Sequence, residues 1–251
     1  MNASNILAFM IDFSPIEIQP PEPPASALVS LETSRYGFSF VDLGLTEEDL
    51  RFFHSLTISH GCHYNQFGNL AETEARISSF LHEMGENEDA VVIYVAKKLD
   101  QFVQTLVAAS GWETAWIYLR ATKSPSEPTL PYWHMDGHYY VAGRDGVQCR
   151  FVLTLLGPST IFYPIPREWP EFRRQIYLNG GNQKWMQELC QPAYVIHLPP
   201  SCGAFLMGGD YRKAALHSEP PLDQNRLFFS VIPCPENQLD VLEKKAMKTY
   251  R

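Results

Sequence analysis

The second half of the chain is a series of short runs of apolar or alternating residues, and this pattern restricts the fold more than any other feature. Turn-forming residues separate the runs, as in Gly157-Pro158 and Pro199-Pro200. Many short strands divided by such turns are typical of a jelly roll. We therefore expect a mainly β fold with flanking α-helices, whose strands cover Glu113–Arg120, Tyr132–Val141, Val147–Leu156, Thr160–Tyr163, Tyr194–His197, Ala204–Met207, Ala214–Ser218 and Arg226–Ile232.

The residues between about 46 and 110 follow a helical pattern instead. Thr46 is followed by three acidic residues, as at the N-cap and first turn of a helix. Apolar residues then recur at helical spacing through Glu72–Met84 and Asp89–Ser110, and Gly111 favours a helix end. Because none of these segments contains a cluster of catalytic residue types, we interpret them as scaffold.

These patterns divide the chain into four parts. The prolines of residues 14–26 favour extended conformations over a helix or a central strand. We therefore predict a proline-rich N-terminal arm (1–30), a helical region packing on the core (31–112), a jelly-roll core (113–235) with an amphipathic helical insertion (167–190), and a C-terminal helix (236–251).

The composition argues against several classes of function. The 251 residues carry a net charge of −8, which disfavours a broad basic surface for duplex nucleic acid. Apolar runs fall short of the roughly 18 residues of a membrane span, and the N-terminus lacks the basic start of a signal peptide. The five cysteines are dispersed and form no CxxC pair, as in proteins that keep their thiols reduced. We expect a cytoplasmic protein.

Two metal-ligand residues stand two positions apart in a predicted strand. Side chains at this spacing point to the same side of a strand, so His134 and Asp136 are placed to reach one ion. A second predicted strand carries His217 and supplies a third ligand from a distant part of the chain. Two histidines and one carboxylate that leave one side of the metal open are the ligand choice of non-haem Fe(II) oxygenases.

His138 offers a different ligand set. If the strand continues past Gly137, His138 faces the same way as His134 and Asp136, and the set suits zinc or a cupin-type site. Gly137 favours a bend, however, which would turn His138 away from the ion. We therefore expect His138 to face the substrate or to support the metal ligands.

Arg226 opens an apolar strand, where a guanidinium is costly unless it meets an anion. Its fork-shaped set of donors suits a carboxylate, and Thr154 or Ser230 is positioned to add a hydroxyl. The alternative is an internal ion pair with Asp210 or Glu219. Arg120 and Arg150, which also lie in predicted strands, are further candidates for contacts to an anion or substrate.

Four segments together resemble the Fe(II)/2-oxoglutarate-dependent dioxygenase superfamily over about residues 113–235, and more faintly an uncharacterised bacterial branch of it. They are Trp133-His134-Met135-Asp136, the run from Phe151 to Phe162, the turn and strand from Pro199 to Leu206, and Ala215–Pro220 followed by Asn225-Arg226-Leu227. In one respect the chain differs from the common pattern: Phe228 replaces the serine expected two residues after the arginine. This leaves Thr154 and Tyr118 as partners for Arg226.

The resemblance implies a double-stranded β-helix, the jelly roll of this superfamily, and an oxidoreductase. Fe(II) would be held by His134, Asp136 and His217, and 2-oxoglutarate by Arg226 with Thr154 and Tyr118. We expect His138, Tyr140, Arg150 and Trp116 to contact the substrate. The implied reaction is hydroxylation of a small, amino-acid-like molecule with release of succinate and CO2, while a protein substrate stays open. The alternatives are a cupin-like metalloenzyme that does not use 2-oxoglutarate and a non-enzymatic metal-binding or ligand-binding module.

Overall fold

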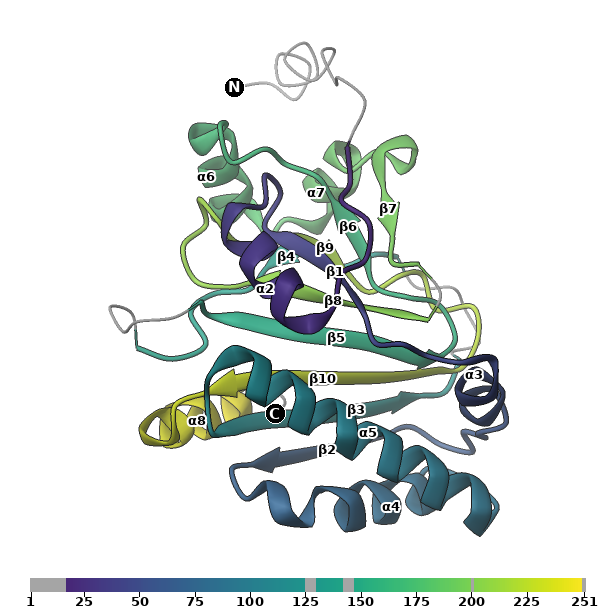
Figure 1. The fold of residues 1–251 in the computed structure, drawn as a ribbon. Coiled ribbons are helices and arrows are strands. Elements are labelled where there is room, and N and C mark those ends of the chain that lie inside the picture. The colour runs from purple at the N-terminus through teal and green to yellow at the C-terminus, as the bar shows by residue number, and fades with distance from the viewer. Residues whose placement is uncertain (1–16, 125–129, 142–146, 200, 250–251) are drawn as a thin grey trace.

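Two antiparallel β-sheets form the centre of the protein, which is described by a computed structural model over residues 17–124, 130–141, 147–199 and 201–249 (Figure 1). The large sheet has the strand order β1 (Phe38–Asp42), β8 (Cys202–Met207), β5 (Cys149–Leu156), β10 (Arg226–Cys234), β3 (Thr114–Thr122) and β2 (Cys62–Phe67). The small sheet has the order β4 (His134–Met135), β9 (Leu216–Ser218), β6 (Ile161–Tyr163) and β7 (Ile196–His197).

Helices cover one face of the large sheet. Alternate residues of β3, such as Ile117 and Leu119, are buried with the apolar faces of these helices in one core cluster. Their neighbours Trp116 and Tyr118 belong to a second cluster on the opposite face. The covering helices are α2 (Pro24–Thr33), α3 (Glu47–His54), α4 (Thr73–Glu83) and α5 (Asp89–Ser110), with the short 3₁₀ turn η1 (Leu70–Glu72) before α4.

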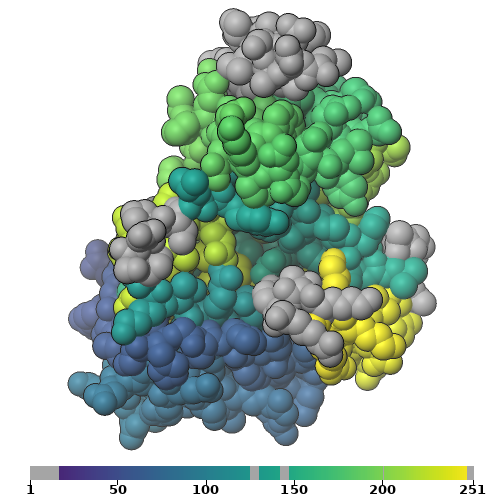
Figure 2. Space-filling view, turned by 180° about the vertical axis from the view of Figure 1, so that it is seen from behind, coloured from purple at the N-terminus to yellow at the C-terminus, as the bar shows by residue number. Residues whose placement is uncertain are grey.

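The second face of the large sheet packs against the small sheet. Phe38 of β1 and Phe162 of β6 meet there with ring centroids 4.6 Å apart. The outer side of the small sheet is covered by α6 (Pro170–Asn179) and α7 (Gln183–Leu189), which pack on residues such as Trp133 and Tyr163. In the space-filling view this segment is the green region at the top of the molecule (Figure 2). Beyond it follow η2 (Pro192–Tyr194), η3 (Glu236–Gln238) and α8 (Leu239–Thr249).

Several local predictions are confirmed. The three segments expected to be helical are α3, α4 and α5. Gly111 ends α5 with a left-handed backbone, at φ 70°. The predicted insertion contains α6 and α7, and the mainly β character with flanking helices is as expected. Within the described residues, no helix is both long and apolar enough to span a membrane.

Other boundaries were predicted wrongly. The region expected to be helical, residues 31–112, also contains β1 and β2, the two edge strands of the large sheet. Both are short, and each is specified by pairing with a distant strand rather than by its own pattern. The boundary at residue 30 falls inside α2, which begins at Pro24 because a proline is tolerated in the first turn of a helix. Residues 1–16 lie outside the described part of the chain.

The predicted strand Tyr132–Val141 was also too long, because only His134 and Met135 pair as β4. The backbone leaves the sheet immediately afterwards, so that Asp136 and Gly137 are not in a strand. This early end proves important for the site described below.

Asp49 connects α3 to α5. Its Oδ2 accepts a 2.8 Å hydrogen bond from the Thr46 backbone N–H, while the Thr46 hydroxyl accepts from the Asp49 N–H, which completes a capping box. On the other side, Oδ1 accepts from the hydroxyl of Tyr94 and lies 3.0 Å from Nζ of Lys98. Burial alone would raise the pKa of Asp49, but these hydrogen bonds outweigh it and lower the pKa from 3.8 to about 2.

A carboxylate whose pKa is lowered by folding stabilises the protein above its unfolded-state pKa and loses that contribution as the pH falls through the folded-state pKa. We therefore expect Asp49→Asn to lower the free energy of unfolding by about 2 kcal/mol at pH 7. The difference from the unmodified protein should shrink between pH 4 and pH 2, as measured by urea denaturation. Asp223→Asn, in the exposed loop before β10, is the matched control. A penalty that stays constant down to pH 2 would contradict the assignment.

Candidate functional site

Strand register places three arginines on the face of the large sheet that looks toward the small sheet. Arg226 lies opposite Thr122, and Phe228 opposite Arg120, in the pairing of β10 with β3. Residues directly opposite each other share a face, as do residues two apart along one strand. Phe228 and Ser230 also lie opposite Thr154 and Val152 of β5, which puts Arg150 on this face too.

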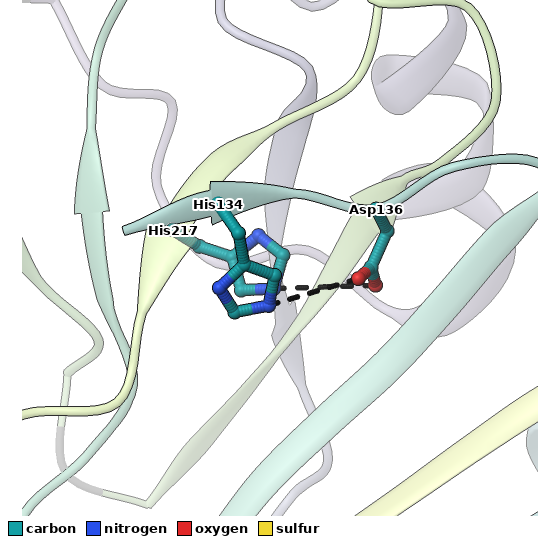
Figure 3. A group of neighbouring side chains, drawn as sticks. All are labelled: His134, Asp136 and His217. Atoms are coloured by element: carbon teal, nitrogen blue, oxygen red, sulfur yellow. Dashed lines mark ion pairs between the residues drawn. The ribbon is translucent and has the colours of Figure 1, made fainter. Parts of the chain in front are cut away.

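The two histidines meet through the pairing of β4 with β9, where His134 lies directly opposite His217. Their ring centroids are 4.3 Å apart. Asp136 follows just beyond the end of β4, and its carboxylate turns toward both rings (Figure 3). One ligand atom from each of the three residues lies within 4.8 Å of the other two. The predicted set of His134, Asp136 and His217 is therefore assembled in space.

Backbone carbonyls orient both imidazole rings. Nδ1 of His134 lies 2.9 Å from the carbonyl oxygen of Tyr132, and Nδ1 of His217 lies 3.2 Å from that of Ala215. A carbonyl oxygen only accepts, so each Nδ1 carries a proton, and in a neutral ring Nε2 then presents a lone pair. The Nε2 atoms lie 3.7 Å and 4.0 Å from Asp136 oxygens, which is too far for hydrogen bonds. This arrangement leaves both lone pairs available to a cation.

The protonation states also suit a metal. Burial by itself would raise the pKa of Asp136, but the neighbouring His217, Arg150 and His134 and the Tyr139 hydroxyl hold it well below its usual range. The Tyr139 hydroxyl donates to Asp136 Oδ2 at 2.7 Å. Burial and the nearby His134 lower the pKa of His217 to about 4. At neutral pH Asp136 is therefore ionised and His217 neutral, the forms that coordinate a divalent ion.

Arg226 is 1% exposed and directs its guanidinium into the same region. Its Nε donates to the carbonyl of Pro158 at 3.0 Å, and its Nη2 donates to the hydroxyl of Thr160 at 3.2 Å. The predicted partner Thr154 is at the limit of hydrogen bonding, 3.5 Å from Nη2. Nη1 is buried and has no hydrogen-bond partner among the residues that the structure describes. Burial, together with Arg120 and Arg150, lowers the pKa of Arg226 to about 9, so it remains charged at neutral pH.

The carboxylate of Glu219 lies between Arg226 and a second arginine, Arg120. Its Oε1 is in direct contact with Nη2 of Arg120 and lies 3.6 Å from Nη1 of Arg226. The predicted alternative, an internal ion pair for Arg226, is therefore present, but its distance of 3.6 Å is longer than a hydrogen bond. Asp210, the other acid considered, pairs instead with Arg212.

These side chains line one cavity of about 380 Å³. It contains the three candidate ligands, Arg226 and the predicted contact Tyr118 at its wall. Of the four predicted substrate contacts, it contains Arg150. Its lining residues are Tyr118, Arg120, Tyr132, His134, Asp136, Arg150, Val152, Thr160, His217, Ser218, Glu219, Arg226 and Phe228.

The other three predicted substrate contacts lie elsewhere. His138 is exposed, because the chain leaves the sheet after Met135, and its carbonyl accepts a hydrogen bond from Lys245. Trp116 stacks on Phe67 and donates through Nε1 to Asn65. Tyr140 is buried in the apolar cluster between the sheets. None of the three is among the cavity-lining residues, and their positions follow from pairings that no local pattern specifies.

Two contacts were not anticipated. Thr160 was assigned only to a strand, yet its hydroxyl is the closest side-chain acceptor for Arg226. Tyr139 supports the carboxylate of Asp136. The only sequence signal for the contact of Tyr139 is its position three residues after Asp136, a candidate ligand.

No family model matches this chain, and no curated protein is similar to it in sequence. Solved structures resemble it distantly. HygX from Streptomyces hygroscopicus, solved with nickel and 2-oxoglutarate bound, is 11% identical, with a TM-score of 0.44 and coverage of 85% of this chain and 88% of that one. A Trichoplax adhaerens prolyl hydroxylase, in complex with a peptide fragment of the hypoxia inducible factor oxygen degradation domain, is 10% identical, with a TM-score of 0.44 over 86% and 91% of the two chains.

The dioxygenase for auxin oxidation 1 from Arabidopsis thaliana, in a complex with 2-oxoglutarate, is 8% identical to this chain. Its TM-score is 0.40, and the match covers 85% of this chain and 90% of that one. At these values the functional assignment of the present chain depends on its own side chains.

Proposed function

We propose that this protein is a non-haem Fe(II) oxygenase that uses 2-oxoglutarate as its cosubstrate. The observation that carries the proposal is that one cavity contains a 2-His-1-carboxylate set and a buried arginine, Arg226, one of whose hydrogen-bond donors has no partner among the described residues. A metal centre of this kind and a carboxylate-binding arginine are the two elements that such a reaction needs side by side.

The residues present fit both groups. Two histidines and an ionised carboxylate leave coordination positions of a metal open, as in non-haem Fe(II) sites. His134, Asp136 and His217 would hold the metal. Arg226 would take a carboxylate of 2-oxoglutarate through Nη1, and the Thr160 hydroxyl keeps the guanidinium aimed at the cavity. A buried donor without a partner is costly, and an incoming carboxylate would satisfy it.

Each residue of the site has a role in this proposal. Bound together, Fe(II) and 2-oxoglutarate would activate dioxygen, the oxidant of the reaction, with one oxygen atom passing to succinate, which is formed together with CO2 from 2-oxoglutarate, and the other passing to the substrate. Tyr139 keeps the Asp136 carboxylate in place through its 2.7 Å hydrogen bond. Tyr118, Val152 and Phe228 line the cavity with apolar surface and exclude water from it.

We also infer that the two sheets are the halves of a double-stranded β-helix, with residues 113–235 as its catalytic core. The support is their antiparallel pairing throughout and the apolar cluster between them. A cavity of about 380 Å³ suits a small or amino-acid-like molecule, and hydroxylation is the reaction we favour. A protein side chain is the second choice of substrate. The net charge of −8 opposes duplex nucleic acid.

One observation favours a second candidate, a cupin-like metalloenzyme that does not use 2-oxoglutarate. Glu219 already stands 3.6 Å from Arg226 and partly neutralises its charge. In that case the arginine would need no external anion.

Calorimetry separates the two candidates. We expect 2-oxoglutarate to bind to the Fe(II)-loaded protein under anaerobic conditions and to bind much more weakly to the metal-free protein, because chelation contributes only when the ion is present. Admission of oxygen should then give succinate. Equal affinity with and without metal, or no binding at all, would favour the cupin-like alternative.

A further inference from the structure

We propose that Arg120 is a positioning residue that keeps the carboxylate of Glu219 away from Arg226, so that Arg226 stays available to an external carboxylate. This inference rests on the proposed function, because it concerns the same anion-binding position. It adds a second arginine and an acid to that position.

The geometry shows a carboxylate shared unequally between two guanidinium groups. Oε1 of Glu219 is in direct contact with Nη2 of Arg120, whereas Nη1 of Arg226 is 3.6 Å away. Glu219 thus forms an ion pair with Arg120, whereas the 3.6 Å that separates it from Arg226 is longer than a hydrogen bond. A shift of under about one ångström would bring it into hydrogen-bonding distance of Arg226.

The burial of the groups makes this competition matter. Arg226 is 1% exposed, and within the described part of the chain its Nη1 has no hydrogen-bond partner. An unpaired buried donor gains from any anion that reaches it. Glu219 follows directly after β9, which ends at Ser218, and is therefore the nearest protein anion that could fill the position. What holds it back is the ion pair with Arg120.

The strand register explains why Arg120 can do this. Arg120 lies opposite Phe228, and Arg226 lies opposite Thr122, so the two arginines are diagonal neighbours on one face of the sheet. Diagonal side chains of this length reach a common point above the sheet. Glu219 lies at that point, and the aromatic ring of Phe228 lies under the Arg226 guanidinium at 4.7 Å.

The chemistry predicts opposite effects for the two partners. Arg120→Gln removes the charge that holds Glu219, which then pairs with Arg226 and must be displaced by any ligand carboxylate. We expect this variant to bind 2-oxoglutarate about 10- to 100-fold more weakly. Glu219→Gln removes the competitor, so its affinity should equal or exceed that of the unmodified protein. The double variant should regain the affinity that Arg120→Gln loses.

The test is a double-mutant cycle, with 2-oxoglutarate titrated calorimetrically into the Zn(II)-loaded full-length protein, so that no turnover intervenes. Arg120→Lys retains the charge and should stay near the unmodified affinity. The exposed ion pair of Arg35 and Glu168 provides a matched control cycle, in which neither single variant should change binding. Circular dichroism melting identifies any variant that fails to fold.

The outcomes are distinct. Weak binding by Arg120→Gln that Glu219→Gln restores supports the inference. Unchanged affinity in Arg120→Gln, a loss that the second substitution does not restore, or a loss in Glu219→Gln alone overturns it. Failure of the proposed function is recognised separately, since the unmodified protein would then not bind 2-oxoglutarate, or Arg226→Ala would bind it equally well.

Discussion

Replacing His134 with alanine should abolish stoichiometric metal binding. The variant keeps only two of three ligands, and the open side of the metal provides no replacement from the protein. Because the loss of a single group that merely supports a metal ligand already costs 10- to 100-fold in affinity, we expect the loss of a ligand to cost at least about 100-fold. Metal content after dialysis against a defined concentration of Fe(II), under anaerobic conditions, measures the effect.

His138→Ala is the matched control for this experiment. His138 stands four residues from His134, but it is exposed and lies outside the cavity lining. Its variant should retain one metal ion per chain. If His138→Ala loses the metal, or His134→Ala keeps it, the triad of His134, Asp136 and His217 is not the metal site.

Arg226→Ala should lower the affinity for 2-oxoglutarate by about 100-fold or more without loss of the metal. A charge-assisted, buried pair with a carboxylate contributes several kcal/mol when one partner is removed. Arg226→Lys should be intermediate, because an ammonium keeps the charge but loses the fork that bonds a carboxylate twice. Calorimetric titration of the Zn(II)-loaded variants gives the affinities, and the bound zinc is measured in parallel.

The control for Arg226 is Arg212→Ala. Arg212 pairs with Asp210 in an exposed position and is not among the residues that line the cavity. Its removal should leave ligand binding unchanged. An Arg226→Ala variant that binds 2-oxoglutarate as tightly as the unmodified protein would show that the anion is held elsewhere in the cavity, with Arg150 the next residue to test.

The helices and their limits were readable from local signals. Thr46 is the predicted N-cap of α3 and also forms a capping box with Asp49, and Gly111 ends α5 in the left-handed conformation that favours glycine. Such features act between residues a few positions apart. The strands β1 and β2 were not predicted, because each is an edge strand whose pairing partner, β8 or β3, is far away in the sequence.

The site shows the same difference between what nearby residues predict and what distant pairing decides. The spacing of His134 and Asp136 predicted that the two side chains would lie together, and they do, even though β4 ends before Asp136. The sequence alone did not exclude His138. It is excluded because the backbone leaves the sheet after Met135, which lies opposite Leu216, the residue where β9 begins.

By itself, the sequence predicted the chemistry of the candidate site: two histidines, a carboxylate and an arginine at the start of an apolar strand, in an order that favours one reaction class. Only the tertiary structure decided which groups share the cavity. The contact of Glu219 with Arg120, the hydrogen bond from Arg226 to the hydroxyl of Thr160 and the position of Trp116 outside the cavity all depend on how distant strands pair. Register is fixed when paired strands bury one face of a sheet together, and the pattern within a single segment does not say which distant strand is its partner.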